Sequence, residues 1–203
     1  MKIISLFFLG FMTFSLMTGC GIEESGGEGG EDDGDEEEAA QAQGVHFQGR
    51  DCLLCHNVDL GPDRHLTVAG TVFKRENPDV DAIEDACGGN LTIQFLDGNR
   101  SAVFDSGDYQ EDNSKGNKGK GNVFILQRML APLRGEYVVR IVSENGVTLT
   151  ESAEPHRFQG EFDPALPADP DNTHSCNACH ATQPVKGAAG PIAVRPGLES
   201  NCG

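Results

Sequence analysis

Alternating hydrophobic and polar positions in the middle of the chain predict β-strands. Side chains of a strand point to opposite faces in turn, so a period of two indicates a strand with one face buried. Six segments carry this pattern or are rich in β-branched and aromatic residues: 66–74, 91–95, 101–106, 123–127, 137–142 and 147–150. Asp97-Gly98-Asn99 and Glu144-Asn145-Gly146 are typical of hairpin turns between such strands. Residues 66–154 are therefore predicted to form an all-β, two-sheet β-sandwich.

The order of turns and strands in this region resembles that of the carboxypeptidase-regulatory or transthyretin-like sandwich family. In that family a Gly-x-Phe turn precedes one strand and a Pro-x-x-Gly-x-Tyr turn precedes the next. The segments that carry the resemblance are 69–72, 91–93 with Asp97-Gly98, 121–124 and 132–139. They span less than half of the chain and consist mostly of turn residues. The resemblance therefore implies an immunoglobulin-like or transthyretin-like sandwich and says almost nothing about activity.

The first residues have the pattern of an export signal. Lys2 precedes an apolar run over residues 3–17, which is too short and too weakly flanked for a membrane-spanning helix. Residues 17–20 resemble the bacterial lipobox, with Met17 where leucine is commonest. The resemblance implies a signal peptide over residues 1–19 and a lipid on Cys20, whose acyl chains would give a stable membrane anchor. Gly21, where inner-membrane lipoproteins often have aspartate, favours the outer membrane, while the alternative reading of this run is a buried core helix.

Most of the chain's excess charge lies in one short stretch. The 203 residues contain 32 acidic and 15 basic side chains, a net charge of −17, which excludes a basic nucleic-acid binder. Ten of those acids fall between residues 23 and 38, and without them and Lys2 a net charge of −8 remains. Residues 20–44 are almost without apolar side chains, so we expect an extended tether. An acidic metal-binding or docking tail is the alternative.

Two segments, residues 52–56 and 176–180, match the pattern Cys-x-x-Cys-His. This is the attachment signature of a c-type haem. Two thiols three positions apart can bond to the two vinyl groups of a haem, and the adjoining histidine then binds the iron. The residues expected to hold two haems in this way are Cys52, Cys55, His56, Cys176, Cys179 and His180.

Zinc and dithiol chemistry are the competing interpretations of these cysteines. Four thiolates from two Cys-x-x-Cys segments can form a zinc site, although the histidine after each pair would then be a coincidence. A thioredoxin-like dithiol is expected at a strand-to-helix turn of a βαβ unit, and the sequence has no such pattern.

The other cysteines complete the count of seven. With Cys20 assigned to lipid and four thiols to haem, Cys87 and Cys202 remain. An even pair in an oxidising compartment predicts a disulfide that attaches the C-terminal tail to the central domain. Two unrelated thiols are the alternative.

Histidine is also the main candidate for the second axial ligand of each iron. Four of the six histidines lie outside the two motifs, and Met129 is the other conventional candidate. His46-Phe47-Gln48-Gly49 recurs as His156-Arg157-Phe158-Gln159-Gly160 ahead of each motif, so His46 and His156 are the preferred ligands. His65 and His174 are weaker candidates. His174 lies two residues before Cys176, so it would serve the other haem or a neighbouring molecule.

Together these patterns predict a lipid-anchored dihaem c-type cytochrome that transfers electrons outside the cytoplasm. Its expected partners are redox proteins or an extracellular acceptor, and a shared haem ligand such as His174 would allow a homo-oligomer. The alternatives are a dihaem enzyme with an open iron position and a zinc-containing β-sandwich that binds a partner. The predicted organisation begins with a signal peptide (1–19), an acidic tether (20–44) and a first haem segment (45–65). The sandwich (66–154) follows, and then a second haem segment with the tail (155–203).

Overall fold

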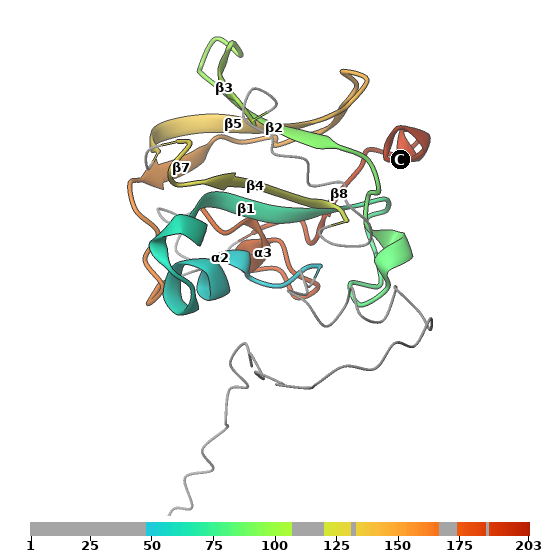
Figure 1. The fold of residues 1–203 in the computed structure, drawn as a ribbon. Coiled ribbons are helices and arrows are strands. Elements are labelled where there is room, and N and C mark those ends of the chain that lie inside the picture. The colour runs from blue at the N-terminus through green and yellow to red at the C-terminus, as the bar shows by residue number, and fades with distance from the viewer. Residues whose placement is uncertain (1–47, 107–119, 131–132, 167–173, 186) are drawn as a thin grey trace, which may run out of the picture. The chain divides into compact units, whose positions relative to one another are not determined.

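The fold was analysed in a computed structural model, of which residues 48–106, 120–130, 133–166, 174–185 and 187–203 are described (Figure 1). The described residues form eight strands and several short helical segments. The strands are β1 (Leu66–Phe73), β2 (Leu91–Leu96), β3 (Ala102–Asp105), β4 (Asn122–Leu126), β5 (Arg134–Ser143), β6 (Thr148–Glu151), β7 (His156–Gln159) and β8 (Ile192–Ala193). The helical segments are α2 (Cys52–Leu54), α3 (Cys176–Cys179), the π-helical turn η1 (Cys55–Asp59) and the 3-10 turns η2 (Pro62–Arg64), η3 (Ile83–Asp85) and η5 (Glu199–Asn201).

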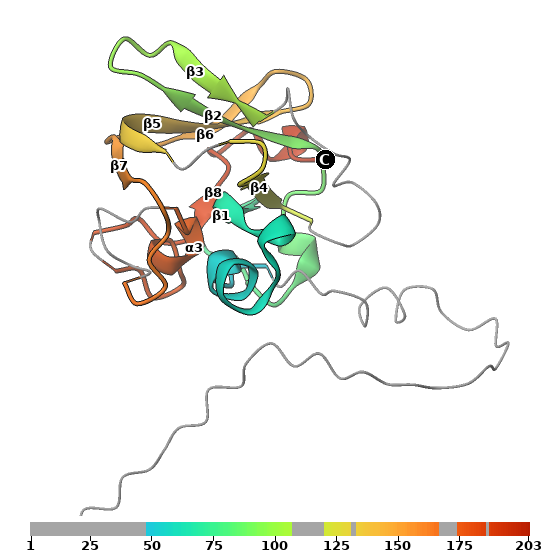
Figure 2. The same cartoon turned by 60° about the vertical axis from the view of Figure 1, so that its left-hand side comes forward.

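The strands form two sheets that pack as layers (Figures 1 and 2). One sheet has the order β4-β1-β8, and the other has the order β3-β2-β5-β6, with β7 also paired to β5. The pairs are antiparallel except for β1 and β8, which run parallel. The predicted all-β sandwich is confirmed, and its immunoglobulin or transthyretin type stays a prediction.

Both predicted hairpin turns join neighbouring strands of the second sheet. Between β2 and β3, the Asp97 carboxylate accepts hydrogen bonds from the Asn99 and Ser101 N–H groups, at 2.8 and 3.0 Å. Between β5 and β6, Gly146 has φ +76°, a left-handed conformation that favours glycine. Local turn chemistry thus fixes these two connections.

The main hydrophobic core lies between the two sheets. Phe95 of β2 is fully buried and contacts three other aromatic rings. Its ring centroid lies 5.5 Å from Phe158, 5.9 Å from Phe104 and 6.0 Å from Tyr137. Each such pair contributes about 0.5–1.5 kcal/mol beyond simple burial. The alternating positions of β2 therefore build the core as predicted.

Strand β1 is buried on both faces, unlike β2. All eight of its residues are buried. One face contributes Val68 and Val72 to the main core, while Leu66 and Ala69 pack with Leu53 of α2 in a second, smaller cluster. The first Cys-x-x-Cys-His motif therefore covers the outer face of the first sheet.

Two strands lie outside the predicted sandwich, within residues 155–203, where the sequence predicts the second haem segment and the tail. His156–Gln159 pairs with β5, and Ile192–Ala193 pairs with β1. Neither gives a clear periodic signal, because β7 has Phe158 as its only fully buried side chain and β8 is two residues long. The neighbouring Val194 is 1% exposed and belongs to the main core, so the tail contributes to the sandwich itself.

The C-terminal tail is also attached covalently. Cys87 and Cys202 form a disulfide with their Cα atoms 4.9 Å apart. The Cys202 carbonyl accepts hydrogen bonds from the N–H groups of Gly88 and Gly89, at 2.7 and 2.9 Å. This is the pair of cysteines that remained in the sequence-based assignment. The disulfide and these two hydrogen bonds hold the tail against the residues before β2.

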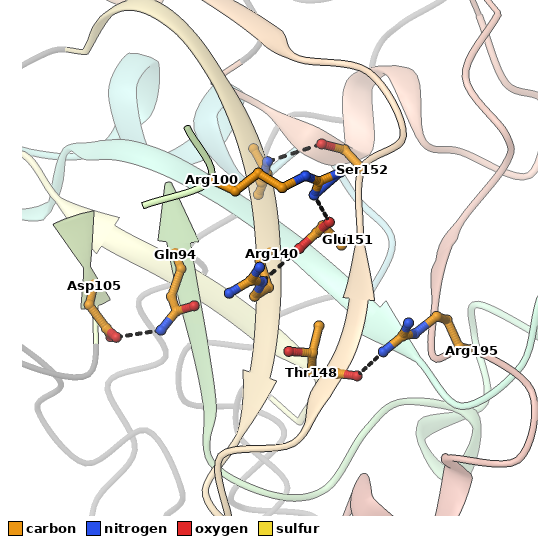
Figure 3. A network of polar contacts seen from close by, with 9 residues as sticks. Gln94, Arg100, Asp105, Arg140, Thr148, Glu151, Ser152 and Arg195 are labelled. Carbon is orange, nitrogen blue, oxygen red and sulfur yellow. Dashed lines mark hydrogen bonds and ion pairs between the residues drawn. The ribbon is translucent and has the colours of Figure 1, made fainter. Parts of the chain in front are cut away.

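The second sheet carries a polar network (Figure 3). Glu151 of β6 accepts hydrogen bonds from Arg100 and from Arg140 Nε, the latter at 2.7 Å. Burial raises the pKa of Glu151, but the bonds and charges of the two arginines outweigh that effect and lower it below its usual range. Arg195 Nη2 donates to the Thr148 carbonyl at 2.6 Å and so connects the tail to the same sheet.

Several predictions fall on residues outside the described ranges. They are the signal peptide (1–19), the lipidated Cys20, the tether (20–44) and the ligand candidate His46. Within the described ranges, no helix has both the length and the apolar character needed to cross a membrane.

Candidate functional site

The two Cys-x-x-Cys-His motifs lie side by side on strand β1. Figures 1 and 2 show α2 and α3 on the face of β1 that points away from the second sheet. The Ala69 N–H donates to the His174 carbonyl at 3.0 Å, and the Thr71 N–H donates to Asn177 Oδ1 at 3.0 Å. The sequence alone left open whether the motifs would lie at opposite ends of the sandwich.

Glycine at position 70 allows this close approach. A Cβ atom on Gly70 would lie 2.6 Å from the Cβ of Cys176. That separation is far below van der Waals contact, so no other residue fits without moving α3. The second motif therefore depends on the absence of a side chain at this point of β1.

Hydrogen bonds also join one motif to the other, although the joined residues are 124 or more positions apart. The Ser175 hydroxyl, just before α3, donates to the Asp51 carboxylate, just before α2. Asn177 Nδ2 donates to the Arg50 carbonyl at 2.7 Å and lies 4.0 Å from Cys52 Sγ. The two motifs thus form one site.

Each motif places its two cysteines on a helical turn. Asp51 caps α2, since its carboxylate accepts from the N–H groups of Leu53 and Leu54 at 3.1 and 3.3 Å. In the second motif the His180 N–H donates to the Cys176 carbonyl at 2.8 Å, which closes a helical turn. Residues three positions apart share one face of an α-helical turn, and this is the spacing of the two cysteines in each motif.

Both motif histidines have the same ring nitrogen held by the backbone. Nδ1 of His56 is 2.8 Å from the Arg64 carbonyl, and Nδ1 of His180 is 2.9 Å from the Gly190 carbonyl. A carbonyl oxygen only accepts, so Nδ1 carries the proton in each ring and Nε2 carries the lone pair. This is the arrangement in which a protein orients a histidine for metal binding.

His156 lies beside His180. Their ring centroids are 6.1 Å apart, and their planes differ by 34°. Two imidazoles bound to opposite sides of one metal ion have centroids roughly 6 Å apart, because each metal–nitrogen bond is about 2 Å long. Among the residues that the structure describes, Nδ1 of His156 is buried and has no hydrogen-bond partner. Burial, and then the neighbouring His180, lower the pKa of His156, which favours the neutral form that binds metals.

The other two described candidates make different contacts. His65 Nε2 is 3.2 Å from the Leu60 carbonyl, so this nitrogen is used within the first motif's own segment. His174 is 1% exposed, its Nδ1 is 2.8 Å from the Thr67 carbonyl, and its ring packs edge-on against Phe158. A haem of a neighbouring molecule would reach His174 only if the residue left the protein interior.

The motif thiols do not resemble those of a redox-active dithiol, whose pKa is lowered. Burial, followed by the charge of Asp51, raises the pKa of Cys52 to about 12. Burial and the neighbouring Cys52 and Cys179 likewise raise the pKa of Cys176 to about 12. Cys55 is disulfide-bonded in the structure, so its thiol would have to be reduced before it could bond to a haem.

Exposed apolar side chains accompany both motifs. Leu54 and Val58, on α2 and η1, are 39% and 52% exposed. Val185 is 39% exposed, and its N–H donates to the Cys179 carbonyl at 3.3 Å. These side chains offer the apolar surface that one face of a large flat cofactor would cover.

Three residues of this site were not predicted: Asp51, Ser175 and Asn177. Asp51 had a usable signal, because aspartate directly before a helix is a common cap. Asn177 occupies a variable position of the Cys-x-x-Cys-His pattern, where nothing in the sequence marks its role.

In the described part of the chain, no three His, Cys, Asp or Glu side chains group closely enough to hold a metal ion by themselves. The four-thiolate zinc site therefore has no assembled ligand set there. No protein-family model, curated protein or solved structure matches this chain.

Proposed function

We propose that this chain is a dihaem c-type cytochrome that transfers electrons outside the cytoplasm. The observation that carries the proposal is the shared arrangement of His56 and His180, in which a backbone carbonyl holds Nδ1 of each ring. Two unrelated segments of chain supply those carbonyls, from Arg64 and Gly190. A histidine that merely follows a cysteine pair by chance has no reason to be oriented in this way twice.

Four cysteines would hold the cofactors, and each haem supplies a one-electron redox centre at its iron. Cys52 and Cys55 would hold the first haem, with His56 as its axial ligand. Cys176 and Cys179 would hold the second, with His180. The apolar side chains of Leu54, Val58 and Val185 would limit the access of water to the two sites.

His156 is the proposed second ligand of the iron bound by His180. The ring separation of 6.1 Å, the lowered pKa of His156 and its buried Nδ1, which has no partner among the described residues, support this role. His46 stays the proposal for the first iron, since His65 is hydrogen-bonded to Leu60. An iron with a histidine on each side has no open position for a substrate, which favours electron transfer over catalysis.

The same proposal includes how the protein is anchored and which partners it meets. A lipid on Cys20 would anchor the chain, since the apolar segment ends in a lipobox-like sequence, and the acidic residues 20–44 would act as a spacer. The transthyretin-like sandwich would support the two haem motifs. Redox proteins or an extracellular acceptor would be the electron partners.

The proposal is tested by the mass of the exported protein, produced in a bacterium that attaches c-type haems. We expect a mass increase of two haems and a covalent haem stain on a denaturing gel. Changing Cys52 and Cys55 to alanine, or Cys176 and Cys179, should each remove one haem, whereas His65→Ala should remove none. A protein without covalent haem would overturn the proposal, and bound zinc in that protein would support the zinc alternative.

Replacement of His156 by alanine should change the spin state of one iron. We expect the parent protein to show only low-spin ferric signals in low-temperature EPR, because each iron has two strong nitrogen ligands. His156→Ala should convert one of the two haems to a high-spin or water-bound form, while His65→Ala should leave both low-spin. A high-spin signal and rapid cyanide binding in the parent protein would instead support the enzyme alternative.

A further inference from the structure

We infer that Asn177, together with the Asp51–Ser175 hydrogen bond, holds the two haem motifs as one coupled pair, so that the haems exchange electrons directly with each other. This inference rests on the proposed function and adds a positioning role for residues outside the Cys-x-x-Cys-His pattern. It distinguishes a two-haem relay from two independent haems that serve separate partners.

Asn177 is buried and makes hydrogen bonds with both ends of its side-chain amide. It is 4% exposed. Its Oδ1 accepts from the Thr71 N–H at 3.0 Å, and its Nδ2 donates to Thr71 Oγ1 at 3.0 Å and to the Arg50 carbonyl at 2.7 Å. Because a backbone N–H can only donate and a carbonyl can only accept, these partners define one orientation of the amide. Asn177 therefore connects the second motif both to β1 and to the residue two positions before Cys52.

Thr71 extends this connection to further parts of the chain. It is fully buried in β1, and its hydroxyl donates to Asn122 Oδ1 of β4 at 2.7 Å. The same oxygen accepts from the Gly49 N–H at 3.0 Å, so it also holds the segment that leads into the first motif. A strand with both faces buried is a rigid support. Movement of either motif would break bonds made by the other.

Asp51 and Ser175 form a second connection at the start of the two helices. The Asp51 carboxylate caps α2 and also accepts from the Ser175 hydroxyl. Cys52 and Cys176 are the next residues in their segments. One carboxylate thus fixes the position of the first cysteine of both motifs.

These contacts place the attachment points of the two haems close together. Asn177 Nδ2 is 4.0 Å from Cys52 Sγ. Asn177 directly follows Cys176, and consecutive Cα atoms are about 3.8 Å apart. Cys52 also lies close enough to Cys176 to contribute to the raised pKa of the Cys176 thiol. Electron transfer slows steeply with distance. Two haems bonded to neighbouring thiols would therefore exchange electrons faster with each other than with a distant partner.

The test is the magnetic interaction between the two ferric irons, measured by EPR on the full protein with both haems attached. We expect the parent's signals to be broadened by that interaction. In the one-haem variants, made by changing either motif's two cysteines to alanine, the remaining signal should be sharp. Asn177→Ala and, separately, Ser175→Ala should reduce the broadening while two haems stay bound. Asn201→Ala is the matched control, because within the described part of the chain its side chain donates only to the Leu198 carbonyl, at 3.3 Å.

The experiment distinguishes failure of the proposed function from failure of the coupling and of the positioning role. If no haem is attached, the proposed function is wrong. If two haems are attached but the parent and one-haem signals have the same width, the function stands and the coupling is wrong. If the parent is broadened and both Asn177→Ala and Ser175→Ala keep that broadening, the positioning role of these residues is wrong.

Discussion

Replacing both Cys87 and Cys202 by alanine should lower the free energy of unfolding by about 4 kcal/mol, because a disulfide across so long a loop strongly restricts the unfolded chain. The two cysteines are 115 positions apart and fully buried. Their disulfide holds the tail that supplies β8 and Val194 to the sandwich. Without it, the tail is still held by β8, by Val194 in the core, by the hydrogen bond of Arg195 to the Thr148 carbonyl and by the bonds of the Cys202 carbonyl.

Urea unfolding followed by circular dichroism measures this loss. In the absence of reductant the double-alanine variant should unfold at a clearly lower urea concentration than the parent. In reductant the two proteins should unfold at nearly the same concentration, which controls for effects of the other cysteines. Equal stability without reductant would mean that Cys87 and Cys202 are not paired in the folded protein.

Gly70→Ala should displace α3 from β1 and prevent haem attachment at the second motif. The added Cβ would lie 2.6 Å from Cys176 Cβ and 3.2 Å from Cys176 Sγ. The first of these atoms is fixed to the helix backbone, so no change of rotamer relieves the contact. Overpacking of this kind typically costs about 1–3 kcal/mol. We therefore expect lower stability together with the mass increase of one haem in place of two.

Gly98→Ala is the control for this substitution. A Cβ atom on Gly98 would meet nothing within 4 Å. That variant should keep both haems and the parent's stability to within a few tenths of a kcal/mol, as for most surface changes. If Gly70→Ala also keeps both haems, the second motif does not depend on close contact with β1.

The strands of the sandwich could be predicted wherever one face of a strand is buried and the other is not. Residues 91–95 show this alternation and form β2, with Leu91, Ile93 and Phe95 in the core. Strand β7 could not be found in this way, because it is short and its exposed positions flank only one large apolar residue. Its pairing with β5 decides that His156 reaches His180, so the missed strand is also the one that matters most for the candidate site.

The sequence by itself determined which residues form the two Cys-x-x-Cys-His motifs, and the tertiary structure decided how those motifs are arranged. Spacing within a motif is local: two cysteines and a histidine at positions i, i+3 and i+4 share a face of any helical turn. The carbonyls that orient His56 and His180, the contact of Cys176 with Gly70 and the bonds of Asn177 join residues up to 127 positions apart. Such contacts depend on how the sheets pack, and no local pattern records them. The structure therefore brings two separate Cys-x-x-Cys-His motifs together in a single site on one buried strand.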